Sequence, residues 1–239
     1  MTGDHAEQDA TALLTPKGRA TRARIVAAAA RLMYDRGVGA TSIDEVRRAA
    51  GVSGSQMTHY FGDKRSLIRA VIGWQADNVI ELHRQPDLGQ LDSLAALRRW
   101  AELNVERQQQ YGCRGGCRLG SLAGELAESD PETRADLAAG FQRWQALLRR
   151  GLTLMRDRGE LRPDADPDQL AYALLAALQG GMLLTQLARD PVPLTAALRT
   201  AIAQVESFVV TAAEPEKVVR KESRRSRLLR RTPAGPGGR

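Results

Sequence analysis

Residues 42–61 hold two short apolar periodicities separated by a three-residue break, Gly51-Val52-Ser53. The first periodicity starts at Ser42, whose hydroxyl can accept from the free N–H groups of a first helical turn, and Glu45 stands three residues on, as in a capping box. Gly51 follows the last periodic residue and tolerates the positive φ of a sharp turn. The segment is therefore predicted to form two short helices that meet at a sharp turn.

The second of these helices is predicted to begin after Ser53, with Met57 and Phe61 facing inward as an i,i+4 apolar pair. The residues left outside are short, polar or aromatic: Gly54, Ser55, Gln56, Thr58, His59 and Tyr60. In a helix-turn-helix unit, such a second helix enters the major groove of DNA. We predict that Gly54, Ser55, Gln56 and His59 approach base edges, with Gln56 suited to adenine. The predicted contacts to the DNA backbone come from Arg22, Ser42, Thr58, Tyr60 and Lys64, and Ser53 is also counted among the DNA-binding residues.

The segment from about Thr21 to Val71 resembles the N-terminal DNA-binding domain of the TetR family of transcriptional regulators. The resemblance rests on these residues: Thr21-Arg22, Ile25, Ala28-Ala29, Leu32-Met33, Gly37, Thr41-Ser42, Ala50-Gly51-Val52-Ser53, His59-Tyr60-Phe61, Lys64 and Leu67. The chain departs from the family at Arg47, where a small residue is usual, and at Thr58, where a tyrosine that contacts phosphate is usual. Thr58 can still hydrogen-bond a phosphate or touch a thymine methyl group.

Charge is distributed unevenly along the chain, whose net charge is +7. Residues 15–72 hold 11 basic and 4 acidic residues, whereas residues 73–214 hold 15 basic and 19 acidic residues. A basic head on a mildly acidic body is typical of a protein that meets phosphate with one end. A nonspecific DNA-binding protein would share this charge pattern, and it would differ by steep salt dependence with little preference among sequences.

The rest of the chain shows helical periodicity and no sustained period-2 alternation, so the predicted fold is all-α with about nine helices. The last helices are expected over about residues 166–189 and 193–213. We divide the chain into a flexible arm (1–17), a helix-turn-helix DNA-binding domain (18–66), a ligand-binding and dimerisation domain (67–213) and a disordered basic tail (214–239). The tail is rich in arginine and ends in Pro and Gly.

The last two predicted helices look too apolar to bury only one face each. In the TetR family, the last two long helices of each subunit pair with their symmetry mates in a four-helix bundle. The resemblance therefore implies a homodimer, whose two recognition helices would read a palindromic double-stranded operator. An ordinary monomeric core is the alternative interpretation of these helices.

A regulator needs an input, and the predicted body carries aromatic side chains with a few polar groups, which suits a pocket for a small organic molecule. The candidate effector-binding residues are Trp100, Tyr111, Cys113, Cys117, Phe141, Trp144, Gln179, Met182 and Gln186. Each of them could instead be a packing residue of the core.

Cys113 and Cys117 are the only cysteines, and the three histidines, His5, His59 and His83, are not spaced near them. This pattern predicts neither a metal site nor a cofactor. The stretch 116–125 resembles a branch of TetR-like repressors that has a cysteine at the start of the sixth helix, and some members of it respond to electrophiles. A helix N-terminus and the neighbours Arg114 and Arg118 are expected to lower the pKa of the thiol, so a redox or electrophile sensor is an alternative version of the same regulator. A small all-α thiol enzyme is a further rival, but no catalytic signature accompanies the cysteines.

The polar and acidic N-terminus shows no signal peptide, and no apolar run reaches the roughly 18 residues of a membrane span. We therefore predict a cytoplasmic protein without membrane attachment. Taken together, these features predict a regulator that is not an enzyme, namely a repressor which a small-molecule effector releases from its operator.

Overall fold

The computed structural model describes residues 14–83 and 85–210, and this part of the chain is helical, with no strand. Nine α-helices lie in these ranges, in agreement with the all-α prediction: α2 (Pro16–Arg36), α3 (Ile43–Ala50), α4 (Gly54–Tyr60), α5 (Lys64–Leu82), α6 (Leu94–Gln110), α7 (Arg118–Leu126), α8 (Pro131–Asp157), α9 (Pro167–Ala188) and α10 (Val192–Glu206). One 3₁₀ turn, η1 (Pro86–Leu88), follows α5.

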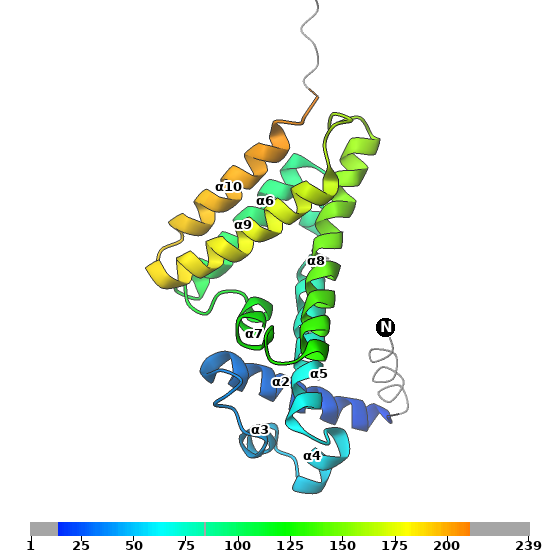
Figure 1. The fold of residues 1–239 in the computed structure, drawn as a ribbon, viewed down its shortest axis with the longest axis vertical. Helices are drawn as coiled ribbons and strands as arrows, with labels where there is room; N and C mark the ends of the chain where they lie inside the picture. The colour runs from blue at the N-terminus through cyan, green and yellow to red at the C-terminus, as the bar shows by residue number, and fades with distance from the viewer. Residues whose placement is uncertain (1–13, 84, 211–239) are drawn as a thin grey trace, which may run out of the picture.

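The first three helices form a small head at one end of the molecule (Figure 1). Ser42 caps α3 in a capping box with Glu45, and Gly51 ends that helix in the left-handed region, at φ 63° and ψ 43°. Ser53 caps α4 in a second capping box, made with Gln56. Local chemistry therefore fixes both ends of the turn between α3 and α4.

The helix α5 begins in the head and runs into the body, where it packs along α8 (Figure 1). Buried apolar residues form two clusters, one in the head and around α5 and α7, the other among α6, α8, α9 and α10. Cys117 and Phe141 pack against both clusters. The two cores therefore meet near the start of α7 and the middle of α8.

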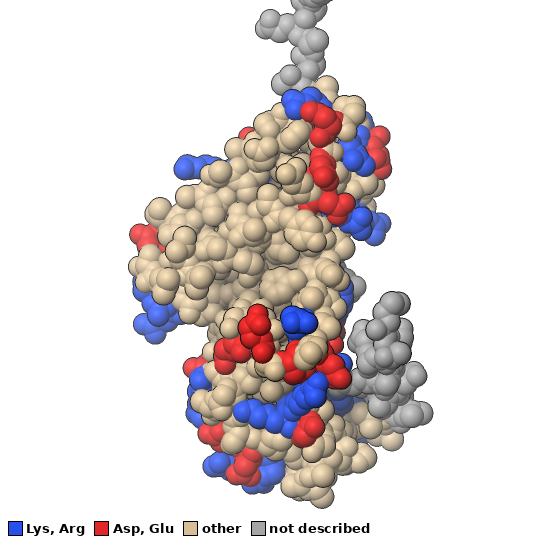
Figure 2. Space-filling model, viewed as in Figure 1, with Lys and Arg blue, Asp and Glu red and all other residues tan. Residues whose placement is uncertain are grey.

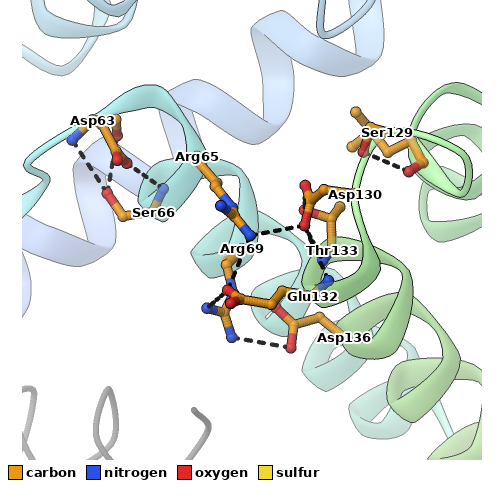
Figure 3. Close-up of polar contacts among 10 residues, drawn as sticks. Asp63, Arg65, Ser66, Arg69, Ser129, Asp130, Glu132, Thr133 and Asp136 are labelled. Carbon is orange, nitrogen blue, oxygen red and sulfur yellow. Dashed lines mark hydrogen bonds and ion pairs between the residues drawn. The ribbon is translucent and has the colours of Figure 1, made fainter.

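Two sets of polar contacts join the head to the body. Glu125 of α7 accepts a hydrogen bond from the backbone N–H of Val38, in the loop after α2, at 2.7 Å. Figure 3 shows the second set, in which Arg65 and Arg69 of α5 meet acidic side chains at the start of α8. The head is therefore held to the body through α5, α7 and α8.

Helix boundaries differ from the sequence expectation at both ends. Helix α2 begins at Pro16, inside the arm expected over residues 1–17. It begins there because Thr15 accepts a hydrogen bond from the N–H of Gly18 and proline suits a first turn. The expectation that the last helix continues to about residue 213 is wrong: α10 ends at Glu206, and Val209 then forms an isolated bridge with Leu161. The predicted basic tail and residues 1–13 of the predicted arm lie outside the described residues.

Helix α9 is the most apolar of the described helices, and by length and composition alone it could cross a membrane. Its inner face packs against α8 and α10, and 44% of its most apolar window is buried within the protein. Helices that pack in protein cores pass the same test of length and composition.

Candidate DNA interface and effector cavity

The short helix α4 presents the residues that the sequence singles out for base contacts. Met57 is 2% exposed and points into the head. The residues on the outer side of the helix are solvent-exposed: Gly54, Ser55, Gln56, Thr58 and His59. This face of α4 is a compact polar surface with one imidazole near its end.

Two side chains on this face are engaged in local hydrogen bonds. The amide oxygen of Gln56 accepts from the backbone N–H of Ser53 at 2.9 Å, and the Thr58 hydroxyl donates to the carbonyl of Gly54 at 3.1 Å. A bidentate contact to adenine uses both the oxygen and the nitrogen of the Gln56 amide, so the oxygen then accepts from adenine through its second lone pair or exchanges Ser53 for adenine.

The residues predicted to contact phosphate surround α4 and also have internal partners. The guanidinium of Arg22 lies over the ring of Phe61, 5.1 Å from its centroid. The ammonium of Lys64 donates to the carbonyl of Val38 at 2.7 Å, which closes the loop between α2 and α3. Tyr60 is half-buried, and Ser42 is exposed at the start of α3. An ammonium has three N–H donors, so Lys64 retains donor capacity beyond this contact.

Arg47 occupies the position where a small residue is usual in the resemblance. The structure accommodates it at the helix surface, because its guanidinium pairs with Asp44 one turn earlier, at 2.8 Å. Arg48 pairs with the same carboxylate at 3.1 Å. The side chain of Arg47 therefore needs no space in the core of the head.

A cavity of about 910 Å³ lies between α5 and α6, and it is bounded by the start of α7 and by single residues of α8 and α9. Its apolar lining includes Trp74, Leu103, Trp144 and Met182. Its polar lining includes Tyr34, Asn104 and Gln108. Charged and amide side chains also line it, so a volume of this size can hold a small organic ligand that has both an apolar part and a polar part. Tyr34 belongs to α2, so the head itself contributes to the wall of the cavity.

His83 joins three helices at the inner wall of this cavity. Its Nε2 atom accepts hydrogen bonds from the indole N–H groups of Trp100, at 3.0 Å, and Trp144, at 3.2 Å. Its Nδ1 atom lies 2.7 Å from the carbonyl of Val79, which places the proton on Nδ1. Burial lowers the pKa of His83, although the hydrogen bond to Val79 opposes this shift. The imidazole is therefore held neutral in one tautomer.

Five of the nine residues predicted to bind an effector line the cavity, and four do not. The lining includes Trp100, Tyr111, Cys117, Trp144 and Met182, and it does not include Cys113, Phe141, Gln179 or Gln186. The ring of Phe141 stacks on that of Trp144, with centroids 6.2 Å apart. The sequence reasoning did not select Tyr34, His83 or Gln108, because their place at the cavity depends on tertiary contacts.

The expectation of a low thiol pKa at Cys117 is wrong. Burial raises the pKa of this thiol, although the hydrogen bond from the N–H of Gly120 opposes the shift. The Cys117 sulfur accepts from the Gly120 N–H at 3.3 Å and so caps α7. The guanidinium of Arg118 lies over the ring of Tyr34 instead, 4.3 Å from its centroid. Cys113 is buried and has a positive φ of 54°.

Among the residues that the structure describes, no group of three or more His, Cys, Asp or Glu side chains is arranged to hold a metal ion.

Comparisons with known proteins match both parts of the chain. Residues 25–71 match the family model described as bacterial regulatory proteins, tetR family. Residues 93–201 match the model described as tetracyclin repressor-like, C-terminal domain. The first matched segment covers most of the head and the start of α5, and the second covers most of the body.

Individual relatives agree with these matches. The transcriptional regulator AcuR of Cereibacter sphaeroides is 33% identical over 172 residues, which are 70% of this chain and 77% of that protein. A solved structure of the regulatory protein TetR from Rhodobacter sphaeroides is 29% identical, with a TM-score of 0.66 over 75% of this chain and 96% of that one. The reduced form of E. coli NemR shares the fold, with a TM-score of 0.68 and 24% identity over 80% of this chain and 99% of that one.

Proposed function

Since the chain belongs to the TetR family of transcriptional regulators, we propose that it is a homodimeric repressor which a small molecule releases from a palindromic operator. The observation that carries the proposal is the exposed polar face of α4, set by the Ser53 cap at the end of the head. We assign base contacts to Gly54, Ser55, Gln56 and His59 and backbone contacts to Arg22, Ser42, Ser53, Thr58, Tyr60 and Lys64.

The mechanism is a shift between two conformers of the dimer. One conformer sets the two recognition helices about one DNA turn apart, roughly 34 to 36 Å, and the other does not. An effector favours the second conformer by its greater affinity for it. The cavity supports this mechanism, because its wall includes Tyr34 of the head and His83 at the end of α5.

A second copy of the chain is the proposed partner of α9. The outer side of this helix exposes Tyr172, Leu183, Leu184 and Leu187. Figure 2 shows few charged side chains on the face of the body over α9. Apolar surface of this kind favours a protein interface. Residues 18–66 are then the DNA-binding domain and residues 67–213 the ligand-binding and dimerisation domain of a cytoplasmic regulator.

Selection of bound fragments from a random DNA pool, at near-physiological salt and with unrelated DNA as competitor, tests the proposal. The expected result is an inverted repeat. Recovery of no shared sequence would contradict sequence-specific regulation and favour nonspecific, charge-driven binding, which weakens steeply with salt.

The thiol-sensing version of the regulator receives less support. A reactive cysteine needs a stabilised thiolate, whereas burial raises the pKa of Cys117. The test is to compare Cys113→Ser and Cys117→Ser with the parent: loss of an electrophile's effect on operator binding in either variant would revive the thiol-sensing version.

A further inference from the structure

The inner wall of the cavity around His83 is formed by Trp100 and Trp144, and neither of these two residues has a free indole donor. Trp100 is 1% exposed and Trp144 is 4% exposed. Both indole N–H groups already donate to Nε2 of His83. Because both donors are occupied, this wall offers a ligand no N–H group, and it suits an apolar or aromatic group.

Three arginines line the same cavity without a carboxylate partner. They are Arg107, Arg114 and Arg118, and none of them forms an ion pair within the part of the chain that the structure describes. Arg107 is half-buried at the end of α6. A guanidinium binds a carboxylate through two parallel N–H donors, and this interaction is stronger where water is partly excluded.

The acidic residues of the lining do not neutralise these arginines. Glu106 pairs with Arg99, which lies outside the lining, at 2.9 Å. Glu81 interacts with another residue, and Asp35 is exposed, as are Arg114 and Arg118, so among the described residues of the lining one unpaired carboxylate stands against three unpaired arginines. Positive charge therefore predominates among the unpaired groups around the cavity, which disfavours a cationic ligand in spite of the aromatic wall.

Gln108 supplies an independent sign of a polar ligand group. Its side chain lines the cavity, is 4% exposed and has an Oε1 atom with no hydrogen-bond partner. This atom is an acceptor and a carboxylate has only acceptors, so the two groups can pair only after the terminal amide rotates by half a turn and presents its N–H donors. A buried polar group without a partner is unfavourable, and a ligand that binds it removes this penalty.

We propose that the cavity binds an organic carboxylate with an apolar or aromatic body. The carboxylate binds Arg107 and Gln108, and the body packs against Trp100 and Trp144. This inference rests on the proposed function for its regulatory meaning, because the ligand is then the class of effector that releases the operator.

Thermal unfolding of the full chain at pH 7 with three matched probes tests the ligand class. The probes are 4-phenylbutyrate, 4-phenylbutyramide and 4-phenylbutylamine, which share the apolar body and differ in the charge of the head. A ligand that binds the native state raises the unfolding temperature by an amount that grows with the logarithm of its affinity at a fixed concentration. We expect the carboxylate to bind at least about tenfold more tightly than the amide, and the amine to bind least.

Variants assign this preference to named residues. Arg107→Gln should reduce the carboxylate-to-amide ratio to about twofold or less, and Arg107→Lys should retain most of the preference. Arg150→Gln is the matched control, because Arg150 is exposed on α8 and outside the lining. Should Arg107→Gln fail to fold, Gln108→Leu serves as the second variant, and it should weaken the carboxylate more than the amine.

Three results would overturn the proposal: equal or tighter binding of the amide or the amine, an unchanged ratio in Arg107→Gln, or no stabilisation by any probe at millimolar concentration. Because this measurement contains no DNA, it stands apart from the fragment selection. A protein that prefers the carboxylate but selects no DNA sequence would overturn the repressor proposal alone.

Discussion

Both ring nitrogens of the buried His83 are hydrogen-bonded, so protonation of the ring breaks some of these hydrogen bonds. An imidazolium has no acceptor, so a proton on Nε2 removes the hydrogen bonds from Trp100 and Trp144. Because burial lowers the pKa of His83 in the folded protein, the unfolded chain binds a proton at a higher pH than the native state. The contribution of His83 to stability is therefore complete above about pH 6.5 and is lost as the pH falls below that value.

We expect the free energy of unfolding to fall by at most about 1.4 kcal/mol per pH unit below about pH 6.5 through this residue. The measurement is urea unfolding between pH 7.5 and 5.5, in parallel with His83→Gln, which does not titrate. The difference in slope between the two proteins isolates the imidazole. Equal slopes would show that other groups govern the acid response.

Gly115, in the loop between α6 and α7, lies against the side chain of Tyr34 in the head. Its φ is +86°, and a Cβ atom there would overlap the Tyr34 hydroxyl. Gly112 also has a positive φ, of +61°, but a Cβ atom there meets open space. The two glycines therefore separate backbone strain from steric overlap.

Gly115→Ala should destabilise the protein by about 1 to 3 kcal/mol more than Gly112→Ala, because both variants carry the strain of positive φ and only the first adds the clash. Urea unfolding of both variants measures this difference. Gly115→Ala should reduce stability less in a Tyr34→Ala background than in the parent protein, because the side chain that causes the clash is then absent. Equal destabilisation by the two alanines would mean that Tyr34 moves aside without cost.

At the scale of helices, α5 and α8 are joined by ion pairs of unequal burial. Arg69 pairs with Asp136, and their side chains are 21% and 27% exposed. Arg143 and Asp77 join the same two helices, with side chains 51% and 68% exposed. The first pair lies in the network of Figure 3.

A double-mutant cycle on Arg69→Met and Asp136→Asn should give a coupling energy of about 1 kcal/mol that decreases with salt, since the pair is partly shielded from water. The same cycle on Arg143→Met and Asp77→Asn should give a value near zero. Urea unfolding at low and high salt provides both numbers. A larger coupling for the exposed pair would contradict the ranking by burial.

Two substitutions at Ser53 can separate the contribution of α4 to stability from its contribution to DNA binding. Ser53→Ala removes the cap and should destabilise the protein by about 1 kcal/mol. Ser53→Asp retains a cap but adds negative charge next to the proposed DNA backbone contacts, so it should preserve stability and weaken DNA binding. Urea unfolding and a DNA-binding titration measure the two effects. Tight DNA binding by Ser53→Asp would place this end of α4 away from phosphate.

The helices that could be predicted from sequence are those whose ends are set by neighbouring residues. Ser42 with Glu45, Gly51 and Ser53 act within one turn of chain, so the boundaries of α3 and α4 follow from local chemistry. The end of α10 does not, because the apolar period continues through Val209 while the chain turns there to meet Leu161.

The cavity was predictable in kind but not in detail. Trp100 and Trp144 stood out as aromatic residues, but their shared acceptor, His83, is 17 residues from the first and 61 from the second. For Cys117, the position in the fold was predictable from the sequence and the effect of burial on its pKa was not. Its position at the start of α7 was correctly predicted, and the sign of its pKa shift was not, because burial outweighs the helix terminus.

At the scale of the whole molecule, the proposed dimer depends on the outer side of α9. Leu187 is 73% exposed there, and Leu183 is 57% exposed. A twofold interface buries the same surface patch of both subunits, so one substitution acts twice. Such an interface is sensitive to a single buried charge.

Leu187→Glu should therefore convert the dimer to a monomer and abolish tight operator binding, because one head alone contacts only half of a palindrome. The matched control is Gln142→Glu, which adds the same charge at an exposed position of α8. Sedimentation analysis gives the mass of each variant, and circular dichroism verifies that the helices are retained. A Leu187→Glu protein that stays dimeric would move the interface away from this part of α9. A monomer that still binds the full operator tightly would separate dimerisation from DNA recognition, and the twofold mechanism would then have to be abandoned.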